Sequence, residues 1–178
     1  MTYQRDFDRR IRLGVVGVGS HAYRNVLPAL HYLPVTLCAV ADTDTERAAR
    51  TARQFGVQGV YASAADMYER ETLDAVLICV SERLHPQLAC EAFAHNLHVW
   101  MEKPPATRAS QVARMIAARG DRVCVVGFKK LFMPSARKVV EILSDERFGP
   151  VQNMVGIYPI GGFPSDGERV LKEDLPND

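Results

Sequence analysis

Two glycines and an alanine near the N-terminus are spaced in a way that suits phosphate binding, in the stretch Gly17-Val-Gly19-Ser-His-Ala22. Gly17 lets the chain turn sharply, Gly19 leaves room for a phosphate to approach the backbone, and Ala22 lets a helix pack close to a strand. The free N–H groups at the start of that helix would face a pyrophosphate. A glycine turn is a weak signal when it stands alone, so the residues that follow it decide its meaning.

An acidic residue, Asp42, lies about 20 residues further on, at the end of an apolar, β-branched stretch. A carboxylate at this position can accept hydrogen bonds from both hydroxyls of an adenosine ribose, and it repels a 2′-phosphate. Thr43 follows it, rather than Arg or Lys, which favours NAD over NADP. The alternative is that Asp42 only begins the next helix cap, but Asp44 is available for that task.

A lysine with restricted surroundings, Lys103, follows a later apolar stretch and lies between Glu102 and Pro104. Its ammonium could donate a hydrogen bond to a substrate oxygen or take part in proton transfer. The alternative is an ordinary loop with a Glu–Lys salt bridge. His85 could touch a nicotinamide ribose or cap the helix that follows it.

The remaining candidates are weaker or absent. Lys129 and Lys130 could bind hydroxyls, a carboxylate or a phosphate of a substrate, or they could form a solvated basic turn. We find no pair of histidines or cysteines with metal-ligand spacing, so no metal site is predicted. The sequence also lacks a GxSxG nucleophile motif and a GxxxxGK[ST] phosphate loop.

The composition limits the class of protein. The 178 residues suffice for one domain and the start of a second. A net charge of +1 gives no reason to expect nucleic acid or an anionic membrane as a partner. The apolar runs are of strand length, and the N-terminus is polar, so neither a transmembrane helix nor a secretory signal is predicted. The four cysteines form no CxxC pair, which favours a reduced, cytoplasmic protein.

Strand and helix patterns alternate along the chain. Strands are predicted at residues 11–16, 35–41, 59–61, 73–80, 97–101 and 123–126, and a further apolar strand at 151–158. Helices are predicted at 20–33, with a kink at Pro28, and at 45–55, 64–70, 84–95, 110–119 and 134–145. Gly56 and Asn96 are expected to end helices in the left-handed conformation.

This alternation predicts the α/β class, with a doubly wound parallel sheet of the Rossmann type and strand order 3-2-1-4-5-6. Ligands of such sheets bind at the carboxyl ends of the strands, where the order reverses beside the first strand. The glycine turn, Asp42, the segment after Val80 and the segment around Lys103 all follow strands toward that edge. We therefore expect them to form one dinucleotide site.

Several motifs follow one another along the chain. They are the glycine turn, Leu27-Pro-Ala-Leu30, Val40-Ala-Asp42 with Glu46-Arg47-Ala48, the stretch at 73–79, His85, His98-Val99, Glu102-Lys-Pro104, and Gly127-Phe128 with Phe132 and Pro134. In this order they resemble the N-terminal half of the Gfo/Idh/MocA oxidoreductases. The resemblance covers roughly residues 12–156. It implies a nicotinamide-dependent dehydrogenase acting on a sugar, a cyclitol or a related polyol, with Lys103 as the catalytic residue near the nicotinamide.

The resemblance also implies which residues contact the cofactor and how the domains divide. The expected contacts are Gly17, Gly19, Ser20, His21, Ala22, Asp42, Thr43, Val80, Ser81, His85, Glu102, Lys103 and Pro104. Residues 1–126 would form the dinucleotide-binding domain, and 127–178 a linker helix and the start of an incomplete α+β substrate domain. Two positions depart from the family pattern: Asn96 replaces a Gly, and Lys130-Leu131 stands where an Arg is often found.

Family members have a second domain of comparable size, which binds substrate and often forms an oligomer interface. The chain is therefore expected to be a piece of a longer protein, a cleavage product or a shortened paralogue, able to bind NAD but slow in turnover. A homo-oligomer is possible if the second sheet is completed. Two alternatives stay open: a non-catalytic NAD(P)-binding regulatory or sensor protein, and a subunit whose partner chain supplies the substrate domain.

Overall fold

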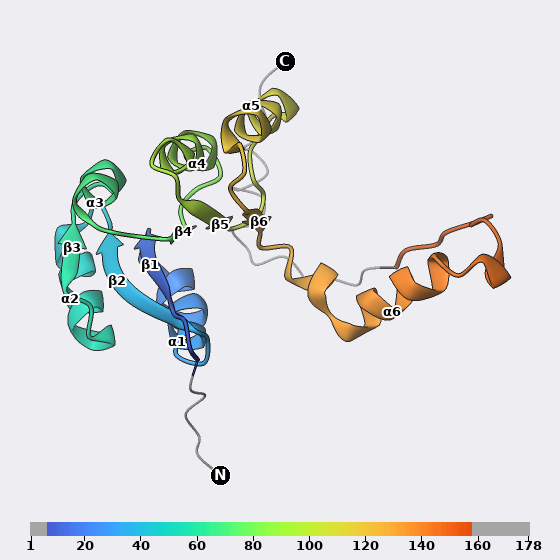
Figure 1. The fold of residues 1–178 in the computed structure, drawn as a ribbon, viewed down its shortest axis with the longest axis horizontal. Coiled ribbons are helices and arrows are strands. Elements are labelled where there is room, and N and C mark those ends of the chain that lie inside the picture. The colour runs from blue at the N-terminus through green and yellow to red at the C-terminus, as the bar shows by residue number, and fades with distance from the viewer. Residues whose placement is uncertain (1–6, 158–178) are drawn as a thin grey trace, which may run out of the picture. The chain divides into compact units, whose positions relative to one another are not determined.

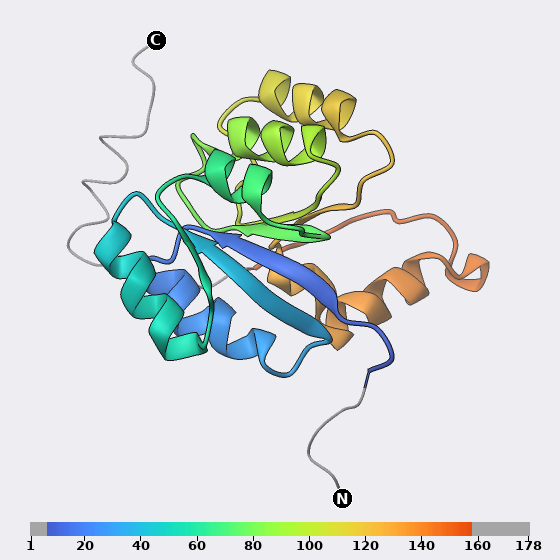
Figure 2. The same cartoon turned by 60° about the vertical axis from the view of Figure 1, so that its left-hand side comes forward.

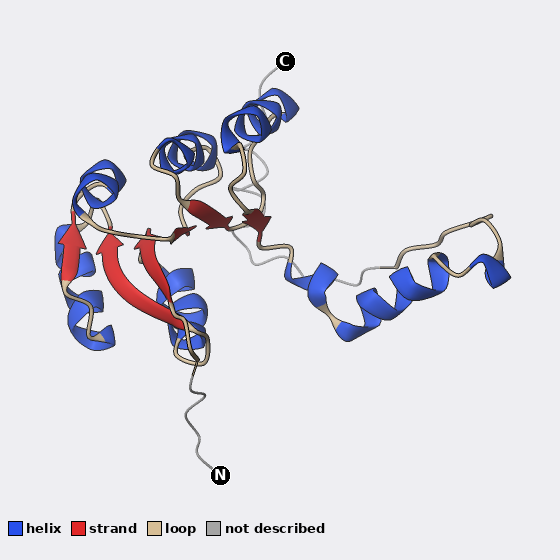
Figure 3. Ribbon diagram, in the orientation of Figure 1, coloured by secondary structure: helices blue, strands red, loops and turns tan. Residues whose placement is uncertain are grey.

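The computed structural model describes residues 7–157, which belong to two compact units, Met1–Leu131 and Phe132–Asp178. The first unit holds a six-stranded sheet (Figures 1 and 3). Its strands are β1 (Ile11–Val16), β2 (Val35–Ala41), β3 (Gly59–Tyr61), β4 (Ala75–Ile78), β5 (His98–Met101) and β6 (Cys124–Val126). Every neighbouring pair is parallel, and the order is β3-β2-β1-β4-β5-β6. The doubly wound parallel sheet and its strand order are thus confirmed.

Helices of the first unit lie on both faces of the sheet (Figure 2). They are η1 (Ala22–Val26), α1 (Leu27–Leu30), α2 (Thr45–Phe55), α3 (Ala64–Arg70), α4 (His85–Ala94) and α5 (Ala109–Arg119). Side chains alternate along each strand, so each face has its own core. Leu13 and Val15 pack with α1 and α2, whereas Val16 and Ile78 pack with α3, α4 and α5.

The ends of α2 show why its bounds match those predicted. The Asp44 side chain accepts a hydrogen bond from the backbone N–H of Arg47, which caps the first turn. Gly56 ends the helix with a φ of 69°, in the left-handed region. Asn96 also takes the left-handed conformation, with a φ of 60°, as predicted.

The helical segment after β1 is irregular, as Pro28 led us to expect. The five residues of η1 form a π-helical turn, in which the N–H of Leu27 bonds to the carbonyl of Ala22. Pro28, which has no N–H to donate, then lies in the first turn of α1. The helix adapts its hydrogen bonding here instead of breaking, and Ala22 remains buried beside the sheet at 1% exposure.

The single tryptophan of the chain, Trp100, lies on β5, two residues before Glu102. Gly127 leaves it space, because a Cβ added to this glycine would lie 2.9 Å from Trp100 Cζ2. The absence of a side chain at Gly127 thus lets the segment that follows β6 pass close to the Trp100 ring.

The second unit contains α6 (Pro134–Leu143) and η3 (Glu146–Phe148), and η2 (Lys129–Phe132) precedes them at the boundary. The strand predicted at 151–158 is wrong for residues 151–157, which form no regular element, while Tyr158 lies outside the described residues. A strand is held by hydrogen bonds to a neighbour, and no described strand pairs with this segment. Its apolar residues are exposed, among them Val155 at 86%.

The strand and helix ends differ slightly elsewhere. The fourth strand is shorter than predicted, because its pairing with β1 and β5 runs from Ala75 to Ile78. α6 ends at Leu143 rather than at residue 145. Within residues 7–157, no helix is long and apolar enough to cross a membrane.

Candidate functional site

The glycine turn joins the end of β1 to the neighbouring strands. The N–H of Gly17 donates to the carbonyl of Ala41 at 2.8 Å, and its φ is +84°. A Cβ at this position would overlap the carbonyl oxygen of Cys79 and lie 2.6 Å from Val80 Cγ1. Gly19 differs, because a Cβ there would meet no atom within 4 Å. The fold therefore requires a glycine at position 17, whereas position 19 opens onto unfilled space.

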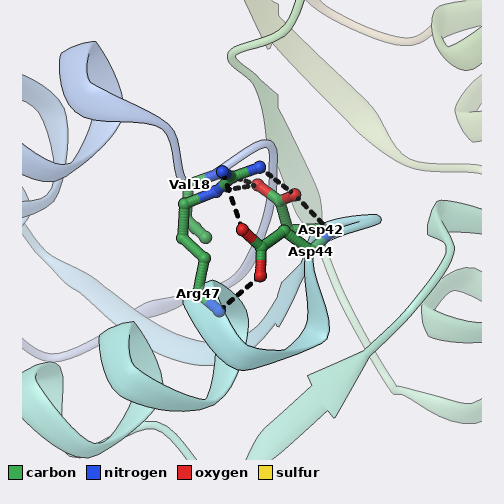
Figure 4. A network of polar contacts seen from close by, with 4 residues as sticks. All are labelled: Val18, Asp42, Asp44 and Arg47. Atoms are coloured by element: carbon green, nitrogen blue, oxygen red, sulfur yellow. Dashed lines mark hydrogen bonds and ion pairs between the residues drawn. The ribbon is translucent and has the colours of Figure 1, made fainter.

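Asp42, at the end of β2, is the centre of a polar cluster formed by Val18, Asp42, Asp44 and Arg47 (Figure 4), which we call the aspartate corner. Its Oδ2 accepts from the backbone N–H of Val18 at 2.9 Å and from Arg47 Nε at 3.2 Å. Its Oδ1 accepts from the backbone N–H of Asp44 at 2.9 Å and from Arg47 Nη2 at 2.7 Å. Arg47 also reaches Asp44 Oδ2 with Nη1 at 3.0 Å.

The charge state of Asp42 follows from these contacts. Burial alone would raise the pKa of the Asp42 carboxyl, since its side chain is only 6% exposed. The hydrogen bonds from Arg47, Asp44 and Val18, together with the positive charge of Arg47, outweigh burial and hold this pKa below its usual value. The aspartate corner therefore keeps a carboxylate ionised at neutral pH.

A second cluster lies at the ends of β4 and β5 and consists of His85, Glu102, Lys103 and Pro104, which we call the lysine corner. His85 is fully buried, and its Nδ1 lies 2.8 Å from the carbonyl oxygen of Pro104. Because a carbonyl only accepts, Nδ1 is the protonated nitrogen of this bond. The other ring nitrogen, Nε2, is buried and has no hydrogen-bond partner among residues 7–157. His85 thus fixes the loop after Lys103 and does not cap α4, whose N-cap is Leu84 without a side-chain hydrogen bond.

Glu102 connects the lysine corner to the glycine turn. Its Oε1 lies 3.0 Å from His21 Nε2, and its Oε2 accepts from the backbone N–H of Lys103 at 3.2 Å. His21 Nδ1 in turn lies 3.2 Å from Asn25 Nδ2. The fold thereby brings together two segments that are 81 residues apart in the sequence.

Lys103 itself is exposed, and the peptide bond that joins it to Pro104 is cis. Among residues 7–157 we find no ion pair or hydrogen bond of its ammonium group, so the salt-bridged Glu–Lys loop considered above is not formed. The neighbouring Cys79 is no candidate nucleophile, because burial, assisted by the negative charge of Glu102, raises the pKa of its thiol to about 12. The ammonium of Lys103 is therefore available to a ligand at this edge of the sheet.

The other predicted contact residues follow the same strand ends. Val80 is partly buried against Gly17, while Thr43 follows Asp42 and is exposed. Ser81 is exposed and its hydroxyl lies 3.4 Å from Glu82 Oε2. Ser20 is exposed at the first residue of the helical segment. Lys129 and Lys130 are exposed in η2.

Sequence analysis missed the role of Arg47. Its signal was present, because Arg47 occupies the third position of the helix that Asp44 caps and lies 5 residues after Asp42. The link between His21 and Glu102 had no sequence signal. In the part of the chain that the structure describes, no group of three or more His, Cys, Asp or Glu is arranged to hold a metal ion.

Comparison with protein families gives a match for the part of the chain that forms the sheet. The family model described as "Oxidoreductase family, NAD-binding Rossmann fold" matches residues 11–129, which is well over half of the chain. The protein therefore belongs to the Gfo/Idh/MocA oxidoreductase family. The family resemblance of the sequence motifs is thus confirmed.

Curated relatives include sugar and cyclitol enzymes. The chain is 31% identical over 162 residues to a dTDP-3,4-didehydro-2,6-dideoxy-alpha-D-glucose 3-reductase of Actinomadura kijaniata, covering 89% of this chain and 48% of the reductase. It is 26% identical over 141 residues to a myo-inositol 2-dehydrogenase of Thermotoga maritima, covering 78% of this chain and 42% of that enzyme. The chain thus spans about half the length of the curated relatives it matches.

Solved structures show the same fold. A 3-ketoreductase from Actinomadura kijaniata in complex with TDP-benzene and NADP matches with a TM-score of 0.68 and 31% identity, over 76% of this chain and 43% of that one. The WlbA dehydrogenase from Bordetella pertussis, in complex with NADH and UDP-GlcNAcA, matches with a TM-score of 0.70 and 28% identity, over 79% and 44%. Relatives of this chain thus bind either nicotinamide dinucleotide.

Proposed function

We propose that this chain is the cofactor-binding part of a dehydrogenase that moves hydride between a nicotinamide dinucleotide and a hydroxylated small molecule. One observation carries the proposal: the glycine turn, the aspartate corner and the lysine corner all stand at the carboxyl edge of the sheet, next to the point where the strand order reverses. Family membership supports the same reaction class.

The residues at this edge fit a dinucleotide. A Cβ added at Gly19 would meet no atom within 4 Å, so the packing of the fold does not explain a glycine at this position. A pyrophosphate lying close to the backbone would explain it. Asp42 is ionised and anchored by two backbone N–H groups, as a carboxylate that reads ribose hydroxyls must be. The buried Nε2 of His85 is a hydrogen-bonding group for which the described part of the chain supplies no partner.

Lys103 would act on the substrate. When bound, the nicotinamide supplies or accepts the hydride. The exposed ammonium of Lys103 would donate a hydrogen bond to the reacting oxygen and stabilise the negative charge that develops there. Glu102 and His85 would orient this lysine, because they bond to its own N–H and to the carbonyl of the next residue.

The substrate is proposed to be a sugar, a nucleotide-linked sugar or a cyclitol, since relatives act on a dTDP-linked deoxysugar and on myo-inositol. NAD is proposed as the preferred cofactor, because Asp42 repels a 2′-phosphate and the exposed Thr43 adds no cation. A cytoplasmic location is proposed, since all four cysteines are unpaired.

The cofactor proposal is tested by titrating the purified protein with NADH and with NADPH and following the nicotinamide fluorescence. Saturable binding, tighter for NADH, is the expected result. Failure of both dinucleotides to bind would overturn the proposed function, and tighter binding of NADPH would overturn the proposed preference.

The catalytic proposal is tested with Lys103→Ala. Loss of a group that hydrogen-bonds the reacting oxygen should lower the rate of hydride transfer by about 100-fold or more. The affinity for NADH should stay within about threefold of the wild-type value. Lys138→Ala is the control, since it also removes an exposed lysine but one that lies in α6, and it should leave the rate unchanged. A regulatory or sensor protein would instead keep both its dinucleotide affinity and its signal in Lys103→Ala.

A further inference from the structure

The carboxylate of Glu102 lies next to the lysine on which the proposed function depends, yet it pairs with other groups. Glu102 directly precedes Lys103 in the chain, and its Oε2 accepts from the backbone N–H of Lys103 at 3.2 Å. A carboxylate and an ammonium on neighbouring residues would be expected to form an ion pair. Among residues 7–157, however, no ion pair or hydrogen bond of the Lys103 ammonium is found.

The second oxygen of this carboxylate is held by His21. Glu102 Oε1 lies 3.0 Å from His21 Nε2, and Asn25 Nδ2 lies 3.2 Å from His21 Nδ1. An amide nitrogen only donates, so Nδ1 accepts from Asn25, and in the neutral ring Nε2 carries the proton that Glu102 accepts. Both oxygens of Glu102 are therefore engaged, and neither of these two donors is the Lys103 ammonium.

The geometry around His21 comes from the irregular helical segment after β1. His21 is the N-cap residue of η1, and Asn25 lies four residues further along the same segment. Side chains at this spacing lie on one side of a helical turn, which lets the Asn25 amide reach the imidazole. The glycine turn places this pair at the end of β1, while Glu102 follows the end of β5. The three side chains form a hydrogen-bonded row from Asn25 through His21 to Glu102.

Without the imidazole, Glu102 Oε1 would lose this donor. The carboxylate would then be free to turn toward the Lys103 ammonium and to form the Glu–Lys salt bridge that was considered from the sequence. In that salt bridge the ammonium would donate to a carboxylate, which would also neutralise part of its positive charge. Lys103 would then be less able to donate a hydrogen bond to a substrate oxygen and to stabilise negative charge there.

We propose that His21 is a positioning residue, whose hydrogen bond keeps the Glu102 carboxylate away from the Lys103 ammonium and so leaves that ammonium available to a substrate. Asn25 supports this role, because its amide fixes the tautomer of His21. The inference rests on the proposed function, since that function gives Lys103 its task at the substrate.

The test measures how fast acetic anhydride acetylates Lys103 in the ligand-free protein, followed by peptide mass spectrometry. The neutral amine reacts and the ammonium does not, so a carboxylate that pairs with the ammonium slows the acetylation. Lys138 in α6, which pairs with Glu141, is the internal reference. In His21→Ala the rate at Lys103 relative to Lys138 should fall by about two- to threefold, because an ion pair that is open to solvent is weak.

Three further variants assign the cause of this change. His21→Gln keeps an N–H donor and should stay within about 1.5-fold of the wild-type rate. The double variant His21→Ala with Glu102→Gln removes the charge that would pair with Lys103, so it should regain the wild-type rate. His31→Ala is the matched control, because it removes another exposed histidine, at the C-cap of α1, and should leave the rate unchanged. Circular dichroism checks that each variant is folded.

The outcomes distinguish this inference from the proposed function. If neither NADH nor NADPH binds the wild-type protein, the proposed function fails. If a dinucleotide binds and Lys103 of His21→Ala is acetylated at the wild-type rate, the role of His21 fails and the proposed function stands. A fall in rate that persists in the double variant would also overturn the role of His21, because Glu102 would not be its cause.

Discussion

The aspartate corner and the lysine corner occupy the same edge of one sheet, yet they are built in opposite ways. At the aspartate corner, a nearly buried carboxylate has its lone-pair positions engaged by the protein. At the lysine corner, an exposed ammonium lacks a charged partner among residues 7–157, and what is fixed is the backbone around it. The engaged carboxylate of the aspartate corner suits recognition of a constant part of a ligand. The exposed ammonium of the lysine corner is left to form its hydrogen bond with a substrate.

The largest effect should come from the glycine that lies between the two corners. In Gly17→Ala the new methyl group would overlap Cys79 and Val80, and the residue would hold a φ of +84°. We expect the free energy of unfolding to fall by about 2–4 kcal/mol in urea denaturation. Gly19→Ala, which adds the same group to open space, should change it by less than about 0.5 kcal/mol. If both variants lose the same free energy of unfolding, the fold does not require a glycine at position 17 more than at position 19.

A smaller loss should follow from releasing the backbone of the lysine corner. His85→Leu removes the donor to the Pro104 carbonyl, whereas His85→Asn keeps a side-chain N–H in place of Nδ1. We expect His85→Leu to be less stable than His85→Asn by about 1 kcal/mol in urea denaturation. If the two variants are equally stable, the bond to Pro104 does not hold this loop.

The aspartate corner should be visible in the acid dependence of stability. The pKa of the Asp42 carboxyl is lowered by its hydrogen bonds, so its charged form stabilises the fold above the ordinary value of 3.8, and that contribution disappears as the pH falls through the lower, folded value. In Arg47→Ala the free energy of unfolding should therefore decrease less steeply as the pH falls. The difference at neutral pH should be below about 1 kcal/mol, since the guanidinium is exposed to solvent. If the free energies of unfolding of wild type and Arg47→Ala change with pH in parallel, Arg47 does not lower the pKa of Asp42.

The smallest effect should come from the contact that joins the glycine turn to the lysine corner. The side chain of His21 is 57% exposed, and its pairing with Glu102 should contribute no more than about 0.5 kcal/mol, so His21→Ala should unfold almost as wild type does in urea. The variant His21→Gln, which keeps a donor, provides the reference. A loss above about 1 kcal/mol in His21→Ala alone would show that the glycine turn and the lysine corner are energetically coupled.

Much of the first unit could be predicted from local signals. The bounds of α2 were predicted because Asp44 and Gly56 mark its two ends, and the strand order followed from alternating strands and helices. The strand predicted at 151–158 was wrong for residues 151–157 because an apolar pattern shows only that a segment suits a strand. A partner strand has to be supplied by the rest of the fold, and none is described for residues 151–157.

The candidate site divides in the same way. Asp42 and Lys103 could be placed at one edge because the carboxyl ends of parallel strands meet there. Their partners could not be predicted, since the contact of His21 with Glu102 and that of His85 with Pro104 depend on how separate loops fold toward each other. Arg47 could be predicted only in part. It lies near Asp42 in the sequence, but the direction of its side chain is set by the helix that Asp44 begins.

The placement of Trp100 gives the molecule an optical reporter of its own. The chain has one tryptophan, on β5 and two residues before Glu102, so all indole emission originates beside the lysine corner. Reduced nicotinamide absorbs light in the region where indole emits. A reduced dinucleotide bound with its nicotinamide near Lys103 would therefore quench this emission by energy transfer, and its occupancy could be followed in the unlabelled protein without any turnover.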